Sequence, residues 1–309
     1  MKENDAANPA DRDRAPARRL VLLPEHVALP GVLAVAAAVV VAAALAATWH
    51  RGVNAYLLAA YWAAGGLGAL TLTAMWLVLH RHENKPTSRA RSQRSARPAS
   101  TLSGFASAAI LVLTVAAVAR LTVALAGQPF LSDDIWRYIH DGATLGIAGE
   151  NPYVQSPAEA EVAYLGNNPD LVTIYQPVSQ WVFAGLARIA ALPHGLPADA
   201  VFRLGFSLVD LLAVGLLLRA LGRAGRSAWW ATLYAWHPLA ITEVAGGGHQ
   251  DPIGIAALLA SLLLAAGVAE RHTSGEGCPS GGVACGAGWE AGCGAAMALS
   301  IAVKPVVAP

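Results

Sequence analysis

Charged side chains are scarce in this chain of 309 residues. Asp, Glu, Lys and Arg make up 13% of it, whereas an ordinary soluble domain has about 25%. Hydrophobic residues make up 55%. This composition excludes a water-soluble globular fold and predicts an all-α polytopic membrane protein. The net charge is +1, so the chain lacks the basic excess of a nucleic-acid-binding protein, and no nucleic-acid partner is expected.

Cysteines and cofactor motifs are also scarce. Cys278, Cys285 and Cys293 lie in one Gly-rich stretch, and their spacing matches no paired zinc motif. The odd count and the spacing argue against a disulfide framework or a structural metal. The sequence contains neither Gly-x-Gly-x-x-Gly after a strand nor a Gly-Lys-Ser/Thr loop, so it indicates no nucleotide site.

Long apolar runs are what the sequence does contain. A helix needs about 20 mostly apolar residues to cross a bilayer, and about seven runs approach that length. They lie at residues 27–48, 55–79, 102–126, 200–221, 228–245, 252–268 and 287–309. We therefore expect about seven transmembrane helices, three within residues 27–126 and four within residues 200–309. Residues 1–26 are polar and mixed in charge, which predicts a disordered cytoplasmic tail.

The placement of charge sets the expected orientation. The loop at residues 80–101 carries many basic residues against one acid, Glu83, and the positive-inside rule places such a loop in the cytoplasm. Residues 127–199 then form an outer catalytic loop, in which acids outnumber bases. Within this loop, residues 174–192 are apolar but interrupted by polar side chains. If this segment lies as a helix on the outer membrane surface instead of crossing the bilayer, most basic residues of the chain stay on the cytoplasmic side. We expect a multi-pass plasma-membrane protein with a cytoplasmic N-terminus.

The start of the outer loop carries the side chains that favour chemistry. Ser132 is a candidate N-cap for a helix beginning at Asp133, so one interpretation of Asp133 and Asp134 is a helix cap alone. One face of that helix presents four polar side chains at three- and four-residue spacing, namely Asp134, Arg137, Tyr138 and Asp141. Adjacent carboxylates at a membrane surface can have one pKa raised and the other kept low, which suits a general base.

Ionisable residues also occur inside the apolar runs. Arg120 and Lys304 lie in the outer halves of their predicted spans, and an ionisable residue at membrane depth indicates a functional role unless its side chain snorkels to the surface. Asp210 lies on the same helical face as Arg203, which indicates a structural ion pair within the bundle.

Another pair of polar residues lies in a later outer turn. His249 and Asp251 follow a run of three glycines. They form either a solvated turn between spans or, with Asp133 or Asp134, part of a divalent-cation site. No metal ligand is assigned, and a divalent cation is the one cofactor left open.

Five motifs, in order, resemble a known family. Ser-Asp-Asp-x-x-Arg-Tyr-x-x-Asp-Gly from Ser132, followed by Gly-x-Asn-Pro-Tyr, resembles the first outer loop of the bacterial GT-C membrane glycosyltransferases, especially the polyprenyl-phosphate-mannose-dependent mannosyltransferases. The others are Tyr175-Gln176-Pro177-x-x-Gln180, Trp236-His237-Pro238-Leu239, Gly248-His249-Gln250-Asp251 and Val303-Lys304-Pro305. Gln176 and His237 depart from the family's Pro and Asn. Family members carry further spans, so the resemblance implies truncation at the C-terminus.

The resemblance implies a GT-C-like helical bundle that acts as a glycosyltransferase. Asp133, or Asp134 in its place, would be the base that accepts the proton of an acceptor hydroxyl. The donor would be a sugar, mannose by resemblance, carried on a polyprenyl phosphate. The acceptor would be a glycan or a lipid, and membrane lipids would be a further partner. The residues expected to bind the donor are Arg120, Arg137, Tyr138, Asp141, Tyr175, Gln180, His249, Asp251 and Lys304.

Two other functional classes stay open. A transporter or lipid flippase would need a polar pathway, which Arg120, Asp210 and Lys304 would form. The sequence has no convincing internal repeat, which such proteins usually show. A membrane metallohydrolase would use His249, Asp251, Asp133 and Asp134. Its usual His-Glu-x-x-His pattern is missing.

Overall fold

The computed structural model describes most of the chain between the first and last predicted spans. The described residues are 55–83, 99–130, 132–159 and 164–274, with isolated positions between 33 and 44 and at 294. Every regular element within these residues is helical, which confirms the predicted fold class at that level. Lys304 and most of the predicted spans at 27–48 and 287–309 lie outside the described residues.

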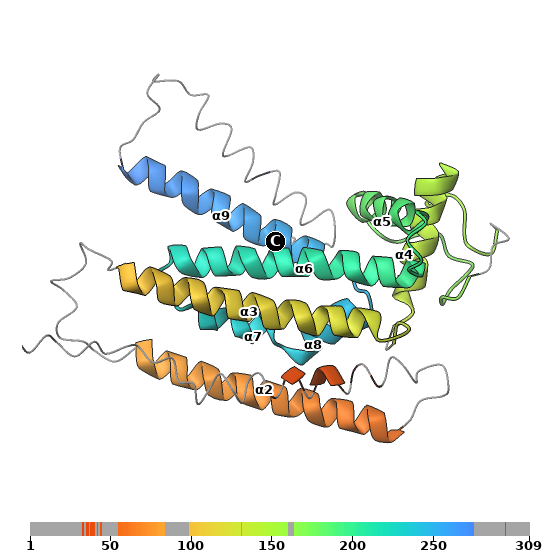
Figure 1. Ribbon diagram of the computed structural model, residues 1–309. Coiled ribbons are helices and arrows are strands. Elements are labelled where there is room, and N and C mark those ends of the chain that lie inside the picture. Colours follow the sequence, from red (N-terminus) through yellow and green to blue (C-terminus); the bar gives the residue numbers. More distant parts are fainter. Residues whose placement is uncertain are drawn as a thin grey trace, which may run out of the picture.

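Four long helices of the described part run beside one another and form the body of the protein (Figure 1). They are α2 (Ala55–Glu83), α3 (Ala99–Leu125), α6 (Ala198–Arg223) and α9 (Pro252–Ser274). Helix α6 packs against both α3 and α9. Among the described residues, two helical stretches are long and apolar enough to cross a membrane, Gly104–Leu125 and Ala198–Arg223. The total of seven spans stays a prediction.

Small and branched apolar side chains make up the core of the bundle. On α3, Val112, Ala116, Ala119 and Val123 recur at three- and four-residue spacing and are all buried. Trp236 packs into the same core, and its Nε1 donates a hydrogen bond to the carbonyl of Val112 at 3.1 Å. The short alanine side chains let neighbouring helices approach α3 closely.

The segment predicted as a span at 228–245 is not one continuous helix. It is divided into η4 (Ala228–Ala231), α7 (Thr232–Ala235), α8 (Pro238–Ile241) and the π-helical turn η5 (Thr242–Gly246). The break lies before Pro238, which lacks a backbone N–H and favours an extended residue in front of it. His237 is extended, with φ −67° and ψ 122°. The prediction of an uninterrupted helix here is wrong.

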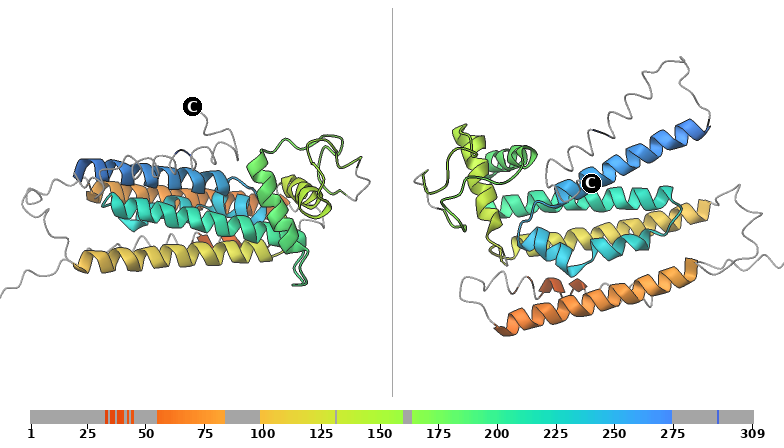
Figure 2. Two further views of the ribbon diagram at one scale, coloured as in Figure 1. Left: turned by 90° about the horizontal axis from the view of Figure 1, so that it is seen from above. Right: turned by 180° about the vertical axis from the view of Figure 1, so that it is seen from behind.

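Two shorter helices lie across one end of the bundle rather than along it (Figures 1 and 2). Helix α4 (Asp134–Ala143) continues into the π-helical turn η3 (Thr144–Ala148), and α5 (Pro177–Ala190) falls within the predicted surface helix. Helix α4 begins one residue later than predicted. The hydroxyl of Ser132 accepts a hydrogen bond from the N–H of Asp134 at 3.2 Å.

Two glycines allow α4 and η3 to lie directly on α5. A Cβ on Gly142 would lie 2.5 Å from the carbonyl oxygen of Phe183, and one on Gly146 would lie 2.6 Å from that of Ala184. Side chains of any size at these positions would push the two helices apart. The glycines therefore fix α4 against α5 at the end of the bundle.

A buried ion pair joins α3 to α6. Arg120 pairs with Asp210, and both side chains are fully buried. Arg203 instead binds Asp199, one turn earlier in its own helix, at 2.6 Å. The predicted pairing of Asp210 with Arg203 is wrong, because helical spacing identifies residues that share a face but not the helix that packs against that face.

Candidate active site

A pocket opens at the end of the bundle where α4 begins. Its walls come from the first turn of α4 and from the loop that leads to α5. Its lining residues are Asp133, Asp134, Arg137, Tyr164, Asn167, Asn168, Leu171, Val172, Ile174 and Tyr175. Carboxylates, amides and phenol rings therefore meet in one place. These groups offer hydrogen-bond acceptors, donors and flat faces, as a ligand rich in hydroxyl groups requires.

The two adjacent carboxylates are accessible in this pocket. Nδ2 of Asn167 donates a hydrogen bond to Oδ2 of Asp133 at 2.9 Å, which orients that carboxylate. The side chain of Asp134 is 52% exposed. Both residues lie at the N-terminus of α4, where the helix dipole stabilises negative charge. Each carboxylate keeps lone pairs that can accept a hydrogen bond from a substrate hydroxyl.

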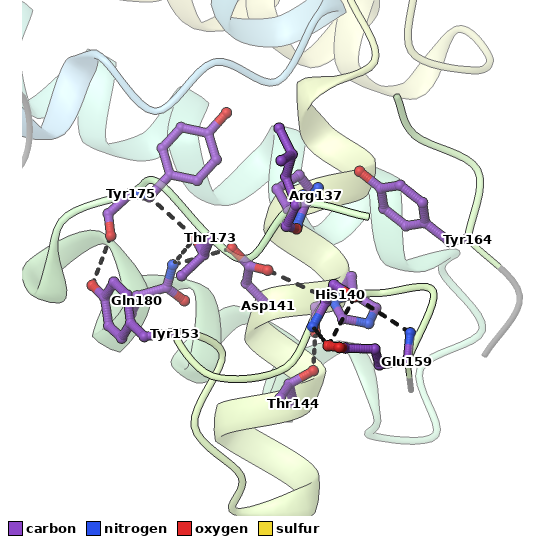
Figure 3. Close-up of polar contacts among 12 residues, drawn as sticks. Arg137, His140, Asp141, Thr144, Tyr153, Glu159, Tyr164, Thr173, Tyr175 and Gln180 are labelled. Atoms are coloured by element: carbon purple, nitrogen blue, oxygen red, sulfur yellow. Dashed lines mark hydrogen bonds and ion pairs between the residues drawn. The ribbon is translucent and has the colours of Figure 1, made fainter. Parts of the chain in front are cut away.

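Arg137 lines the pocket, but its guanidinium is held by the loop. It donates hydrogen bonds of 2.6 Å each to the carbonyl oxygens of Leu171 and Asn168. Its Cζ lies 5.2 Å from the ring centroid of Tyr164, and the two side chains are drawn together in Figure 3. The structure thus gives Arg137 a role in shaping the pocket wall, with two of its N–H donors engaged by the loop.

Two tyrosines predicted to bind the donor belong to an aromatic cluster beside the pocket. Tyr138 stacks on Phe183 with ring centroids 4.6 Å apart and meets the edge of Tyr175 at 4.9 Å. Burial raises the pKa of the Tyr138 phenol well above its ordinary value. Burial, and then the charge of Asp134, raises the pKa of Tyr175 to about 12. Tyr175 lines the pocket, whereas Tyr138 is buried and packs against the Tyr175 ring.

A buried polar network holds the chain that carries Tyr175 (Figure 3). Nε2 of Gln180 donates to Oδ2 of Asp141 at 3.1 Å and to the hydroxyl of Thr173 at 2.8 Å. The hydroxyl of Tyr153 donates to the carbonyl of Tyr175 at 2.6 Å. Asp141 and Gln180, both predicted to bind the donor, are only 1% exposed and do not line the pocket. Their contacts position the pocket wall.

His249 approaches the same carboxylates from the turn that precedes α9. Its Nδ1 lies 3.9 Å from Oδ2 of Asp134, and its side chain is 19% exposed. Of the described candidates for binding a phosphate, Arg137 lines the same pocket as the two carboxylates, and His249 reaches Asp134 from outside the pocket lining. His249 and Asp134 are 115 residues apart in the sequence. They lie close together because the turn before α9 contacts the first turn of α4.

Two of the three remaining candidates fall within the described residues. Arg120 is inside the bundle, in its ion pair with Asp210. Asp251 lies directly before α9 and is absent from the described lining of the pocket. Lys304 falls outside the described residues.

Sequence reasoning missed part of the pocket. Tyr164 and Asn167 come from the loop between α4 and α5, and Asn167 contacts Asp133 across 34 residues. The run Asn-Asn-Pro at 167–169 signals a turn. A turn signal does not say which distant residue the turn contacts.

Comparison with known proteins places the chain in a family. The family model described as alpha-(1->6)-mannopyranosyltransferase, N-terminal domain, matches residues 21–308. No curated protein and no solved structure matches the chain. The family match agrees with the apolar helices and with the resemblance seen in the ordered motifs. The chain therefore belongs to the alpha-(1->6)-mannopyranosyltransferase family, and it is a membrane glycosyltransferase.

Proposed function

We propose that the protein transfers mannose from a polyprenyl-phosphate donor to a hydroxyl group of a glycan or lipid acceptor at the outer face of the membrane. One observation carries this proposal. Two accessible carboxylates, Asp133 and Asp134, share a polar pocket at the end of an apolar bundle, with His249 beside them. A lipid-linked donor would reach such a pocket from the bilayer while the acceptor enters from water.

The proposed reaction is a single displacement. The carboxylate of Asp133, or of Asp134 in its place, accepts the proton of the acceptor hydroxyl. The acceptor oxygen forms a bond to the anomeric carbon of mannose as the bond between that carbon and the phosphate oxygen breaks. The electron pair of the broken bond stays on the polyprenyl phosphate. Such a displacement inverts the anomeric carbon.

The leaving phosphate gains negative charge and needs a nearby cation or hydrogen-bond donor. Arg137 donates to two loop carbonyls, and Arg120 is paired with Asp210. We therefore assign this role to His249, with Lys304 as the further expected contributor. Within the described residues, no three His, Cys, Asp or Glu side chains form a group that could hold a metal ion.

The proposed membrane arrangement follows from the same geometry. Helices α4 and α5 lie across the end of the bundle, and α5 presents Trp181 with 74% of its surface exposed. An exposed indole on a helix at this position supports an interfacial location for α5. We propose seven spans with a cytoplasmic N-terminus. Cysteine-accessibility labelling at positions 193–198 in a variant without native cysteines should report the outer side, and cytoplasmic labelling would contradict the arrangement.

The transporter and metallohydrolase alternatives receive less support. Two side chains of the supposed polar pathway, Arg120 and Asp210, are paired with each other inside the bundle. Asp251 does not join Asp133 and Asp134 in the pocket. Solute uptake without covalent transfer would nevertheless favour the transporter.

The donor assignment is tested by supplying membranes that contain the full-length protein with radiolabelled mannose in two forms. One form is polyprenyl-phosphate mannose, and the other is a nucleotide-linked mannose. We expect transfer to endogenous acceptors from the lipid-linked donor alone, because the sequence has no nucleotide-binding loop. Transfer from the nucleotide sugar in membranes depleted of polyprenyl phosphate would contradict the proposal.

A further inference from the structure

An unusually wide turn precedes helix α9. It begins with η5, a single π-helical turn, a feature often found at functional sites. The N–H of Gly247 donates to the carbonyl of Thr242 at 2.8 Å. The N–H of His249 donates to the carbonyl of Glu243 at 3.1 Å. The backbone therefore folds back on itself and brings residue 249 over residue 243.

The side chains of the same two residues also meet. Nε2 of His249 lies 3.2 Å from Oε2 of Glu243, while Nδ1 faces Asp134 at 3.9 Å. The ring thus lies between two carboxylates that come from different elements. A neutral imidazole donates from one nitrogen, whereas an imidazolium donates from both, so the charged ring can serve both carboxylates.

Gly247 leaves the space that this arrangement needs. A Cβ on Gly247 would lie 3.0 Å from Cδ2 of His249 and 3.1 Å from the carbonyl oxygen of Glu243. The histidine ring therefore packs against the backbone of the turn. Its orientation is set by the backbone on one side and by the Glu243 carboxylate at one ring nitrogen.

We propose that Glu243 is a positioning residue that holds the His249 ring with Nδ1 directed at Asp134. Glu243 acts through His249 and touches no reacting atom. Its contact fixes the rotation of the ring, so that Nδ1 stays directed at Asp134, where the leaving phosphate needs a hydrogen-bond donor. This inference rests on the proposed transfer reaction, to which it adds a residue outside the pocket lining.

A double-mutant cycle in the full-length protein tests the coupling. We expect Glu243→Ala to lower kcat by about tenfold or more, with a smaller change in the KM of the acceptor, because misplacement of a catalytic group acts on the chemical step. Glu243→Gln keeps an oxygen that accepts from Nε2 and should lose less. In a His249→Ala background, Glu243→Ala should cause no further loss. An equal loss in both backgrounds, or no loss in either, would overturn the proposal.

A spectroscopic measurement separates this inference from the proposed reaction. In protein labelled with ¹⁵N-histidine, the ring resonances of His249, identified by their disappearance in His249→Asn, should shift in Glu243→Ala. They should stay in place in Glu150→Ala, the same change at an exposed acid. Unchanged His249 resonances in Glu243→Ala would refute the positioning role. The two proposals can fail separately. If the His249 resonances shift in Glu243→Ala but the double variant Asp133→Ala with Asp134→Ala still transfers mannose, the proposed reaction is wrong, whereas the contact between Glu243 and His249 is supported.

Discussion

Arg120 and Asp210 form an ion pair between α3 and α6 in which both side chains are fully buried. The guanidinium also donates to the carbonyl of Ala235 at 2.9 Å, and the hydroxyl of Tyr234 donates to the second oxygen of Asp210. The network therefore ties α3, α6 and α7 together. A charge this deep in an apolar bundle requires its partner, so we assign Arg120 to the stability of the bundle rather than to donor binding.

Removing the carboxylate of this pair should destabilise the protein strongly. Asp210→Ala leaves the Arg120 guanidinium buried without its counter-ion, and we expect a loss of about 3–5 kcal/mol in the free energy of unfolding. Asp170→Ala changes an exposed acid of the loop between α4 and α5 and should stay within about 0.5 kcal/mol of the wild type. Denaturation in detergent compares the two variants. Equal stability of both would contradict the structural role of the pair.

Two glycines with nearly the same positive φ separate strain from steric contact. Gly149 has φ 73° and a Cβ there would meet nothing within 4 Å, whereas Gly248 has φ 75° and a Cβ there would lie 2.5 Å from Cδ1 of the buried Ile135. We expect Gly149→Ala to cost about 1–2 kcal/mol and to leave transfer almost unchanged. Gly248→Ala should cost more and lower kcat by about tenfold, because it moves the turn that carries His249.

Stability and transfer measured on these two variants give the comparison. If Gly248→Ala matched Gly149→Ala in both quantities, the close packing of the turn against α4 would have no functional consequence.

The raised pKa of Tyr175 predicts a loss of stability in alkali. The phenol titrates near its ordinary pKa of 10.0 in the unfolded chain and at about 12 in the folded protein. Below pH 10 both states keep the proton, whereas between pH 10 and 12 the unfolded state loses it first, so stability falls as pH rises. Tyr175→Phe should make the decline shallower in this window. Identical declines in both proteins would contradict the assigned burial of the phenol.

Asn167 offers a test of how Asp133 is oriented. Asn167→Ala removes the 2.9 Å hydrogen bond to the carboxylate, and we expect kcat to fall by roughly fivefold to tenfold with the fold intact. Asn167→Asp places a second negative charge beside Asp133 and should reduce kcat further. Steady-state kinetics with circular dichroism measure both effects. Greater activity of the Asp variant than of the Ala variant would argue against this contact.

The parts of the fold that depend on local pattern follow from the sequence. Apolar length located α3 and α6, and spacing placed Tyr138 and Asp141 on one face of α4, although it did not predict that both side chains are buried. Contacts between distant segments do not follow. Asp210 finds Arg120 across 90 residues because α3 packs against α6, and helical periodicity carries no information about that packing.

The pocket shows the same division. The adjacent pair Asp133 and Asp134 is visible as a motif, and His249 is visible as a polar residue in a glycine-rich turn. Asn167 and Glu243 are ordinary polar residues in the sequence. Their importance arises from the folding of a loop and of a π-helical turn onto the two motifs. Pro238 marks the break in the predicted span at 228–245, and a prediction from apolar length alone does not register that proline.

The central claim is that a carboxylate of the α4 pocket is the base in mannosyl transfer. The most direct measurement is the initial rate of mannose transfer from polyprenyl-phosphate mannose by the full-length protein with Asp133→Ala, Asp134→Ala, both changes together, or the control Asp170→Ala. We expect the double variant to lose about a hundredfold or more of kcat, with Asp170→Ala near the wild type. A double variant that folds normally and transfers mannose at the wild-type rate would contradict the account.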